Sequence, residues 1–206
     1  MYWKSLGAAA LIAAGAASAE APMPESARSC DIHVYPADGV HSVGEDFDAV
    51  KRVDQDLRDY YRAAGRSLDW LTPDRQLTLI SQLPIARLIG ADNSPTTMHS
   101  EPLSRHQALE PGPRQPGAGC VVEVMLPQLM LERGGLAGRS LRVFGVVRRY
   151  DNGALTRSYS GFASSSMEGF RLKAPEDAPA ATSLVEQAYR GAVETVLRNS
   201  TKIPRK

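Results

Sequence analysis

The chain has 206 residues, of which 43% are hydrophobic and 23% are charged, close to the averages of globular proteins. Its 24 lysines and arginines nearly balance its 23 aspartates and glutamates, so no strong overall field would attract it to nucleic acid or to an anionic membrane. The length suits one domain with a substantial core, and we expect no nucleic-acid partner.

The beginning of the chain has the pattern of an export signal. One cation, Lys4, precedes an uncharged run at 6–17, and Ala17-Ser18-Ala19 has the small-x-small pattern that signal peptidase cuts. The run has about a dozen residues, whereas a membrane-spanning helix needs about 20. We therefore expect residues 1–19 to be a removable signal peptide and the mature chain to be periplasmic or secreted, without a transmembrane segment. The alternative is a buried alanine-rich helix in a cytosolic domain.

Two cysteines, Cys30 and Cys120, remain after the expected cleavage. An even number of cysteines in an oxidising compartment favours one disulfide bond. It would close a loop of about 90 residues and stabilise the fold by about 4–5 kcal/mol on the chain-entropy model. The alternative is a lipid anchor at Cys30. The polar, proline-containing residues 20–29 argue against that anchor because a lipidated cysteine normally follows the apolar run directly, and we expect them to form a disordered leader.

The front half of the chain predicts a strand followed by helices. Alternating apolar and polar residues over Asp31–Pro36 predict a short strand. An apolar stripe over Asp46–Ala64 predicts an amphipathic helix. Thr72-Pro73-Asp74 combines a capping hydroxyl, a proline and an acid in the order that begins a helix. Pro84 should divide this helical region into two short helices, or one kinked helix, ending at Gly90.

The middle of the chain, Asp92–Gly119, shows the weakest pattern. Thr96–Ser100 has the composition of a short strand. Glu110–Gly119 is rich in proline and glycine, which predicts an exposed loop.

The back half predicts three strands and a final helix. Asp151-Asn152-Gly153 is a strong hairpin signal, and Pro127 should mark a bulge or a sheet edge. The predicted elements are strands at Cys120–Leu131, Arg139–Tyr150 and Ala154–Ala163, and a helix at Ala178–Asn199. The complete order predicts an α/β (α+β) fold, with helices packed on a mixed sheet of four or five strands. We expect one domain at 30–199 and a flexible basic tail at 200–206.

Two segments resemble a group of exported bacterial proteins of unassigned function. They are Cys30–Pro36 (CDIHVYP) and Cys120–Val124 (CVVEV) with the adjoining strand pair. In that group the paired cysteines open two strands, so the resemblance also implies a disulfide. The topology resembles small α/β accessory domains of the bacterial envelope, such as the amino-terminal domain of the Tol-Pal periplasmic protein and auxiliary subunits of lipid-transport machines. Because one topology serves many functions, this resemblance implies no activity.

The sequence contains none of the motifs G-x-S-x-G, S-x-x-K, H-E-x-x-H, G-x-x-x-x-G-K-[ST] and G-x-G-x-x-G. The weak metal candidates are His99, Glu101 and His106, because zinc accepts imidazole nitrogen and carboxylate oxygen. His33 or His41 would have to approach them through the fold. A catalytic zinc needs three rigidly held protein ligands, and this segment is a proline-flanked loop. We therefore expect no metal or other cofactor.

Three arginines, Arg142, Arg148 and Arg149, lie close to the predicted hairpin. A guanidinium group matches the geometry of phosphate, so these residues are candidates for binding an anionic glycan or a lipid headgroup. The competing interpretation is that they only solubilise the surface.

The sequence as a whole favours an exported, non-enzymatic binding or accessory module of the bacterial cell envelope. Its partner would be an envelope protein, an anionic glycan or a lipid headgroup. The alternative is a secreted hydrolase with a dispersed active site, since catalytic residues need not be adjacent in sequence. Convergent serine, histidine and acidic side chains in a pocket would favour the hydrolase, whereas a basic groove or an exposed apolar patch would favour binding.

Overall fold

The computed structural model describes residues 29–40, 69–117, 119–134, 138–170 and 175–202. The expected signal peptide, most of the expected leader, the expected helix at Asp46–Ala64 and His41 lie outside the described residues.

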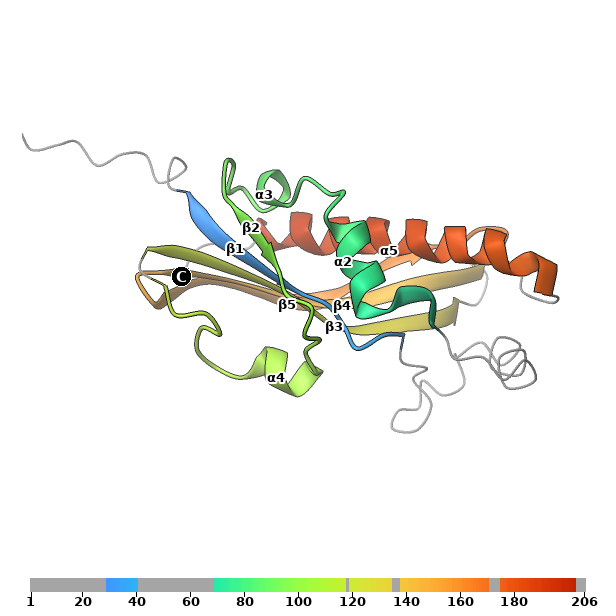
Figure 1. The fold of residues 1–206 in the computed structure, drawn as a ribbon, viewed down its shortest axis with the longest axis horizontal. Helices are drawn as coiled ribbons and strands as arrows, with labels where there is room; N and C mark the ends of the chain where they lie inside the picture. Colours follow the sequence, from blue (N-terminus) through green and yellow to red (C-terminus); the bar gives the residue numbers. More distant parts are fainter. Residues whose placement is uncertain (1–28, 41–68, 118, 135–137, 171–174, 203–206) are drawn as a thin grey trace, which may run out of the picture.

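Five strands form one mixed sheet in the described part of the chain (Figure 1), in the order β2-β1-β3-β4-β5. The strands are β1 (Cys30–Tyr35), β2 (Thr96–Met98), β3 (Cys120–Gly134), β4 (Gly138–Asp151) and β5 (Ala154–Ser166). Strand β1 pairs in parallel with both β2 and β3, and β3, β4 and β5 form an antiparallel meander. The predicted fold class is therefore confirmed.

The hairpin between β4 and β5 and the irregularity in β3 follow from local sequence. Asn152 and Gly153 have φ values of 52° and 79°, and positive φ at both central residues is what a type I′ turn requires. The β3–β4 register shifts between Met125 and Gln128, where Pro127 lacks the N–H that a regular ladder needs. Both predictions, the hairpin and the bulge, are confirmed.

Among the described residues, three helices cover one face of the sheet and a fourth lies on the other face (Figure 1). The first face carries α2 (Pro73–Ile80), α3 (Ile85–Leu88) and α5 (Ala178–Ser200), and the second carries α4 (Arg105–Leu109). Two single turns of 3-10 helix, η3 (Asp69–Leu71) and η4 (Pro175–Asp177), precede α2 and α5. None of the helices in the described residues is long and apolar enough to cross a membrane. We call the first face the helix face and the second the loop face.

Helix α2 begins as predicted. The side chain of Thr72 accepts a hydrogen bond from the backbone N–H of Arg75, and Pro73 and Asp74 occupy the first turn. Pro84 separates α2 from α3, so the interpretation as two short helices is confirmed.

Helix α4 lies in the segment for which the sequence predicted no helix. Ser104 and Gln107 form a capping box: the Ser104 hydroxyl accepts from the Gln107 N–H, and the Gln107 side chain accepts from the Ser104 N–H. The helix has only five residues, too few to show a helical period in the sequence. The described residues of Glu110–Gly119 form the predicted loop.

The main core lies between the sheet and the helices of the helix face, α2, α3 and α5. Strand residues that point to this face are almost completely buried, among them Ile32, Val124 and Val143. Helix α5 approaches β4 so closely that a Cβ atom on Gly145 would lie 2.4 Å from a methyl carbon of Val196. The loop face has a smaller core. It contains Tyr35, Leu103, Ala108, Met125, Phe144 and Val146.

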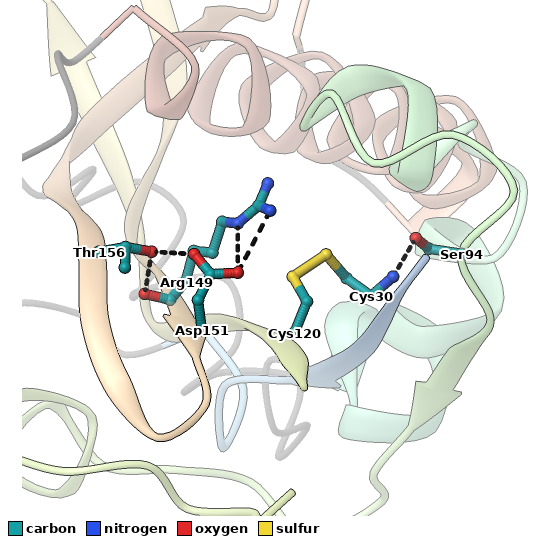
Figure 2. Close-up of a disulfide and its surroundings, with 6 residues drawn as sticks. All are labelled: Cys30, Ser94, Cys120, Arg149, Asp151 and Thr156. Carbon is teal, nitrogen blue, oxygen red and sulfur yellow. Dashed lines mark hydrogen bonds and ion pairs between the residues drawn. A yellow bond between two sulfur atoms is a disulfide. The ribbon is translucent and has the colours of Figure 1, made fainter. Parts of the chain in front are cut away.

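The predicted disulfide is present and joins the first residues of β1 and β3 (Figure 2). Cys30 and Cys120 are register partners in the parallel ladder, with a Cα–Cα distance of 4.5 Å. The Cys30 N–H donates to the Ser94 hydroxyl at 2.8 Å, which fixes the start of β1. The sulfur of Cys30 is therefore occupied, and the lipid-anchor alternative is wrong.

Candidate binding surfaces

The three arginines proposed as one anion site lie on both faces of β4. Successive residues of a strand point to opposite faces, so Arg148 lies on the loop face and Arg149 on the helix face. Arg149 is 8% exposed and contacts Asp151 Oδ1 at 3.3 Å (Figure 2). The other oxygen of Asp151 accepts from the Thr156 hydroxyl at 2.6 Å. Arg149 is thus part of an internal network beside the disulfide.

Arg148 also forms a hydrogen bond within the protein. It is 8% exposed, and its Nη1 donates to the backbone oxygen of Glu110 at 2.6 Å. The structure therefore does not bring the three arginines into one surface, and the predicted cluster needs correction. Of the three, Arg142 is the most exposed, with 34% of its side chain accessible.

A row of polar side chains crosses the loop face. His33 on β1, Glu123 on β3 and Arg148 on β4 are successive register partners. Glu123 is fully buried, and its Oε1 accepts from the backbone N–H groups of Arg114 and Gln115. The carboxylate therefore holds the loop after α4 against the sheet.

Two tyrosines complete the attachment of this loop. The Tyr150 hydroxyl donates to the backbone oxygen of Gly112 at 2.8 Å, and Gln115 donates to the Tyr35 hydroxyl at 3.3 Å. Burial raises the pKa of both phenols, so both remain protonated at neutral pH. We interpret this network as structural, because its groups bind the protein's own loop.

Two histidines meet at one end of the row. The Nδ1 of His33 lies 3.0 Å from the Nε2 of His99, and the ring of His99 stacks on Tyr35 with a centroid distance of 4.3 Å. Burial lowers the pKa of His99, the neighbouring His33 lowers it further, and Glu101 opposes both effects. A neutral imidazole at this position can donate or accept a hydrogen bond within the pair.

The predicted metal candidates are not gathered at this pair. His106 lies on α4, where its Nδ1 is 3.3 Å from a carboxylate oxygen of Glu110. His99 contacts His33, and Glu101 acts on His99 only electrostatically. Within the described ranges, no group of three or more histidine, cysteine or acidic residues is arranged to hold a metal ion.

A different set of side chains on the loop face is directed away from these attachments. Arg105, Arg142, Phe144 and Phe162 form what we call the arginine–phenylalanine surface. The two rings lie 4.9 Å apart, the Arg105 guanidinium is 4.6 Å from the Phe144 centroid, and the Arg142 guanidinium is 4.1 Å from the Phe162 centroid. Arg142 also pairs with Glu132 at 3.2 Å.

The geometry of this surface suits the binding of anions. A guanidinium that stacks on an aromatic ring keeps its in-plane N–H groups available for a carboxylate or a phosphate. Arg105 is exposed, and no side chain or backbone group in the described part of the chain accepts a hydrogen bond from it. The rings hold both guanidinium groups in place, and Arg142 is also paired with Glu132.

A groove lies beside β2, at the opposite edge of the sheet from β5. It has a volume of about 600 Å³ and is open to solvent. Its apolar lining comes from Leu83, Ile85 and Ala86, in α3 and the residues before it, and from Met98 of β2. The other residues that line it are Ser81, Pro84, Arg87, Asp92 and Thr96. We call it the β2 groove. Its volume is within the range of about 300–1,000 Å³ that is usual for ligand sites.

Sequence reasoning named Arg142 but missed the other members of the arginine–phenylalanine surface and the burial of Glu123. Glu123 is a single acid in the apolar run CVVEVM, and such an interruption was a usable signal that this face of β3 is not a simple core. Phe144 and Phe162 are register partners only because the β4–β5 ladder shifts by one residue between Arg149 and Tyr150. A regular ladder from the Asn152-Gly153 turn would have placed the two rings on opposite faces, so turn and strand alternation were not enough to pair them. For Arg105 the usable signal was the Ser104-x-x-Gln107 pattern of a capping box, which marks the start of its helix.

No protein-family model matches the chain, and the comparison with curated proteins also gives no match. Two solved structures show distant similarity. One is the hypothetical protein CT253 from Chlamydia trachomatis, with 12% identity, a TM-score of 0.38 and coverage of 84% of this chain and 95% of that one. The other is a minor lipoprotein from Acinetobacter baumannii, with 10% identity, a TM-score of 0.36 and coverage of 87% and 97%. At these scores the similarities carry no argument about function.

Proposed function

We propose that the protein is an exported, non-enzymatic binding or accessory module of the bacterial cell envelope. Its arginine–phenylalanine surface binds the phosphate or carboxylate groups of an envelope lipid headgroup or glycan. The observation that carries this proposal is the pair of guanidinium groups held over Phe144 and Phe162 on one face of the sheet.

Two features support the location. Disulfide bonds form and persist in oxidising compartments, and the Cys30–Cys120 bond is built into the start of two adjacent strands. The sequence at 1–19 has the pattern of an export signal.

The test is a binding measurement with two anionic probes. The purified protein is mixed with phosphatidylglycerol vesicles, with phosphatidylcholine vesicles, and with polygalacturonate, which presents carboxylates on a soluble glycan. We expect binding to at least one anionic probe, none to phosphatidylcholine, and weakening as salt rises. Binding to phosphatidylglycerol alone assigns a headgroup, and binding to polygalacturonate alone assigns a glycan.

The variants decide whether the named surface is responsible. The double substitution Arg105→Gln, Arg142→Gln should weaken binding at least about tenfold, because charge-assisted contacts contribute roughly 1.5–3 kcal/mol each. Arg198→Gln, on α5, is the matched control and should leave binding unchanged. Equal affinity of the double variant and the unaltered protein would refute the proposal.

A substitution of Glu132 should change the affinity for the anionic probe in the opposite direction. Its carboxylate pairs with Arg142 and competes with any external anion. Glu132→Gln should therefore increase the affinity for the anionic probe, by about two- to fivefold for a partly exposed pair.

A secreted hydrolase remains the second candidate, favoured by the contact between His33 and His99. One neutral imidazole of such a pair can act as a general base. The test is whether the purified protein hydrolyses 4-nitrophenyl acetate or 4-nitrophenyl phosphate. Turnover that is abolished in the double variant His33→Gln, His99→Gln would favour the hydrolase over the binding module.

A further inference from the structure

We propose that the outer edge of β2 and the β2 groove bind an extended peptide segment of a partner protein, which adds to the sheet as a sixth strand. This site is separate from the arginine–phenylalanine surface, since β2 is at one edge of the sheet and the surface lies on β4 and β5 with α4. The two proposals therefore stand or fall independently.

The backbone of β2 presents hydrogen-bonding groups on its outer side. Pro95 O accepts from β1, and the His99 N–H donates to β1. In a parallel ladder, every second residue of a strand forms its backbone hydrogen bonds to the same neighbouring strand. Residue 97 lies between the two bonds just named, so both its N–H and its C=O point toward β1. Thr96 and Met98 therefore direct their N–H and C=O groups away from β1, and no hydrogen bond to them is found within the described residues.

The same two residues line the β2 groove. Their side chains lie on the helix face, as register partners of buried residues of β1. A peptide paired with β2 would thus direct alternate side chains into the space between β2 and α3. There it would meet the apolar side chains of Leu83, Ile85 and Ala86, with the charged residues Arg87 and Asp92 also lining the groove. Main-chain hydrogen bonds with side-chain pockets at alternate positions are the features of peptide recognition by strand addition.

Two other occupants fit this edge less well. A second copy of the chain would pair through only three residues, far short of the roughly 1,200 Å² that stable interfaces bury. A lipid acyl chain would fill the groove but would leave the N–H and C=O groups of Thr96 and Met98 without partners. An extended peptide satisfies both the groove and the backbone.

The probe is a library of random 12-residue peptides displayed on phage, selected on the folded, disulfide-bonded protein. Enriched peptides are synthesised, and their affinity is measured with the unaltered protein and with two variants. Thr96→Pro removes one outward N–H and leaves the ladder with β1 intact, since proline is tolerated at a sheet edge. Thr96→Val keeps the N–H and is the matched control. Hydrogen exchange of the Thr97 and His99 amides checks that β2 still pairs with β1 in both variants.

We expect enriched peptides with apolar residues at every second position. Thr96→Pro should weaken them by about three- to tenfold, the loss of one net hydrogen bond, and Thr96→Val should leave their affinity unchanged. The bound peptide should also slow the exchange of the Thr96 and Met98 amides. No enriched peptide, equal binding to Thr96→Pro, or protection elsewhere in the protein would overturn the proposal. Binding of a fluorescent fatty acid that these peptides fail to displace would assign the groove to a lipid and overturn it as well.

Discussion

The two faces of the sheet are built in different ways. The helix face is apolar along β1, β3 and most of β4, and the 23-residue helix α5 covers it together with α2 and α3. The loop face carries a histidine, a buried glutamate and two arginines on neighbouring strands, and its cover is a five-residue helix and a loop. Side chains of the sheet hold that loop through its backbone, as Glu123 does.

This difference assigns most of the folding stability to the helix face and the binding of anions to the loop face. The helix face supplies most of the buried apolar area, which is the dominant favourable term in folding. The loop face keeps its shape through a few directed hydrogen bonds, so its remaining surface can carry exposed cations over aromatic rings. Substitutions on the two faces should therefore have different consequences.

The largest effect should come from the disulfide at the end of the helix face. The double substitution Cys30→Ala, Cys120→Ala releases a loop of about 90 residues and should lower the free energy of unfolding by about 4–5 kcal/mol. Urea unfolding of the variant and of the oxidised protein measures the difference. A loss below about 1 kcal/mol would mean that the bond does not constrain the unfolded chain.

The corresponding test of the loop face is Glu123→Ala. It leaves the partly buried N–H groups of Arg114 and Gln115 without their acceptor, so we expect a loss of about 3 kcal/mol. Glu123→Gln keeps an acceptor oxygen and should cost less. Faster hydrogen exchange of the two amides in Glu123→Ala, with α5 unchanged, would locate the effect on this face. Equal costs of the two substitutions would contradict the role given to the carboxylate.

The tight contact between β4 and α5 allows a smaller test. Gly145→Ala places a methyl group against Val196 and should destabilise the protein by about 1–3 kcal/mol. Adding Val196→Ala provides space, so the double variant should be more stable than the sum of the two single effects predicts. Strict additivity in thermal unfolding would show that the helix can move away at little cost.

The smallest effect is the pH dependence that His99 adds to stability. The pKa of His99 is lowered in the folded protein by burial and by His33, so the unfolded chain takes up the proton first as the pH falls below about 6.5. The contribution is fully present above that pH and is lost below it. The melting temperature of His99→Gln should consequently fall less between pH 7.5 and pH 5 than that of the unaltered protein. His106→Gln, exposed on α4, is the control, and parallel curves for all three proteins would argue against the pair.

Local signals were sufficient for most of the fold. The Thr72-Pro73-Asp74 cap, the Asn152-Gly153 turn and Pro127 each act within a few residues, and the structure has the predicted feature at each position. The disulfide followed from the number of cysteines and the expected compartment. Helix α4 was missed because its stability depends on a capping box and on packing of Ala108, not on a long apolar period.

The site was harder to predict because it depends on pairing between distant segments. His33 and His99 are 66 residues apart and meet only through the parallel β1–β2 pair. The grouping of Arg148 with Arg149 ignored strand alternation, which sends adjacent residues to opposite faces. Applying that rule to β4 would have placed Arg142 and Arg148 on the same face of the sheet. The hydrogen bond of Arg148 to the loop could be found only from the structure.

Adjacent residues of β4 allow the most direct test of the separation between the two faces. Leu141 is fully buried on the helix face, and Arg142 lies next to it on the loop face. We predict that Leu141→Ala lowers the free energy of unfolding by about 2–5 kcal/mol while the folded variant binds the anionic probe normally. Arg142→Gln should change stability by less than about 1 kcal/mol and weaken binding several-fold. Unchanged binding in Arg142→Gln, or weakened binding in folded Leu141→Ala, would contradict the assignment of binding to the loop face.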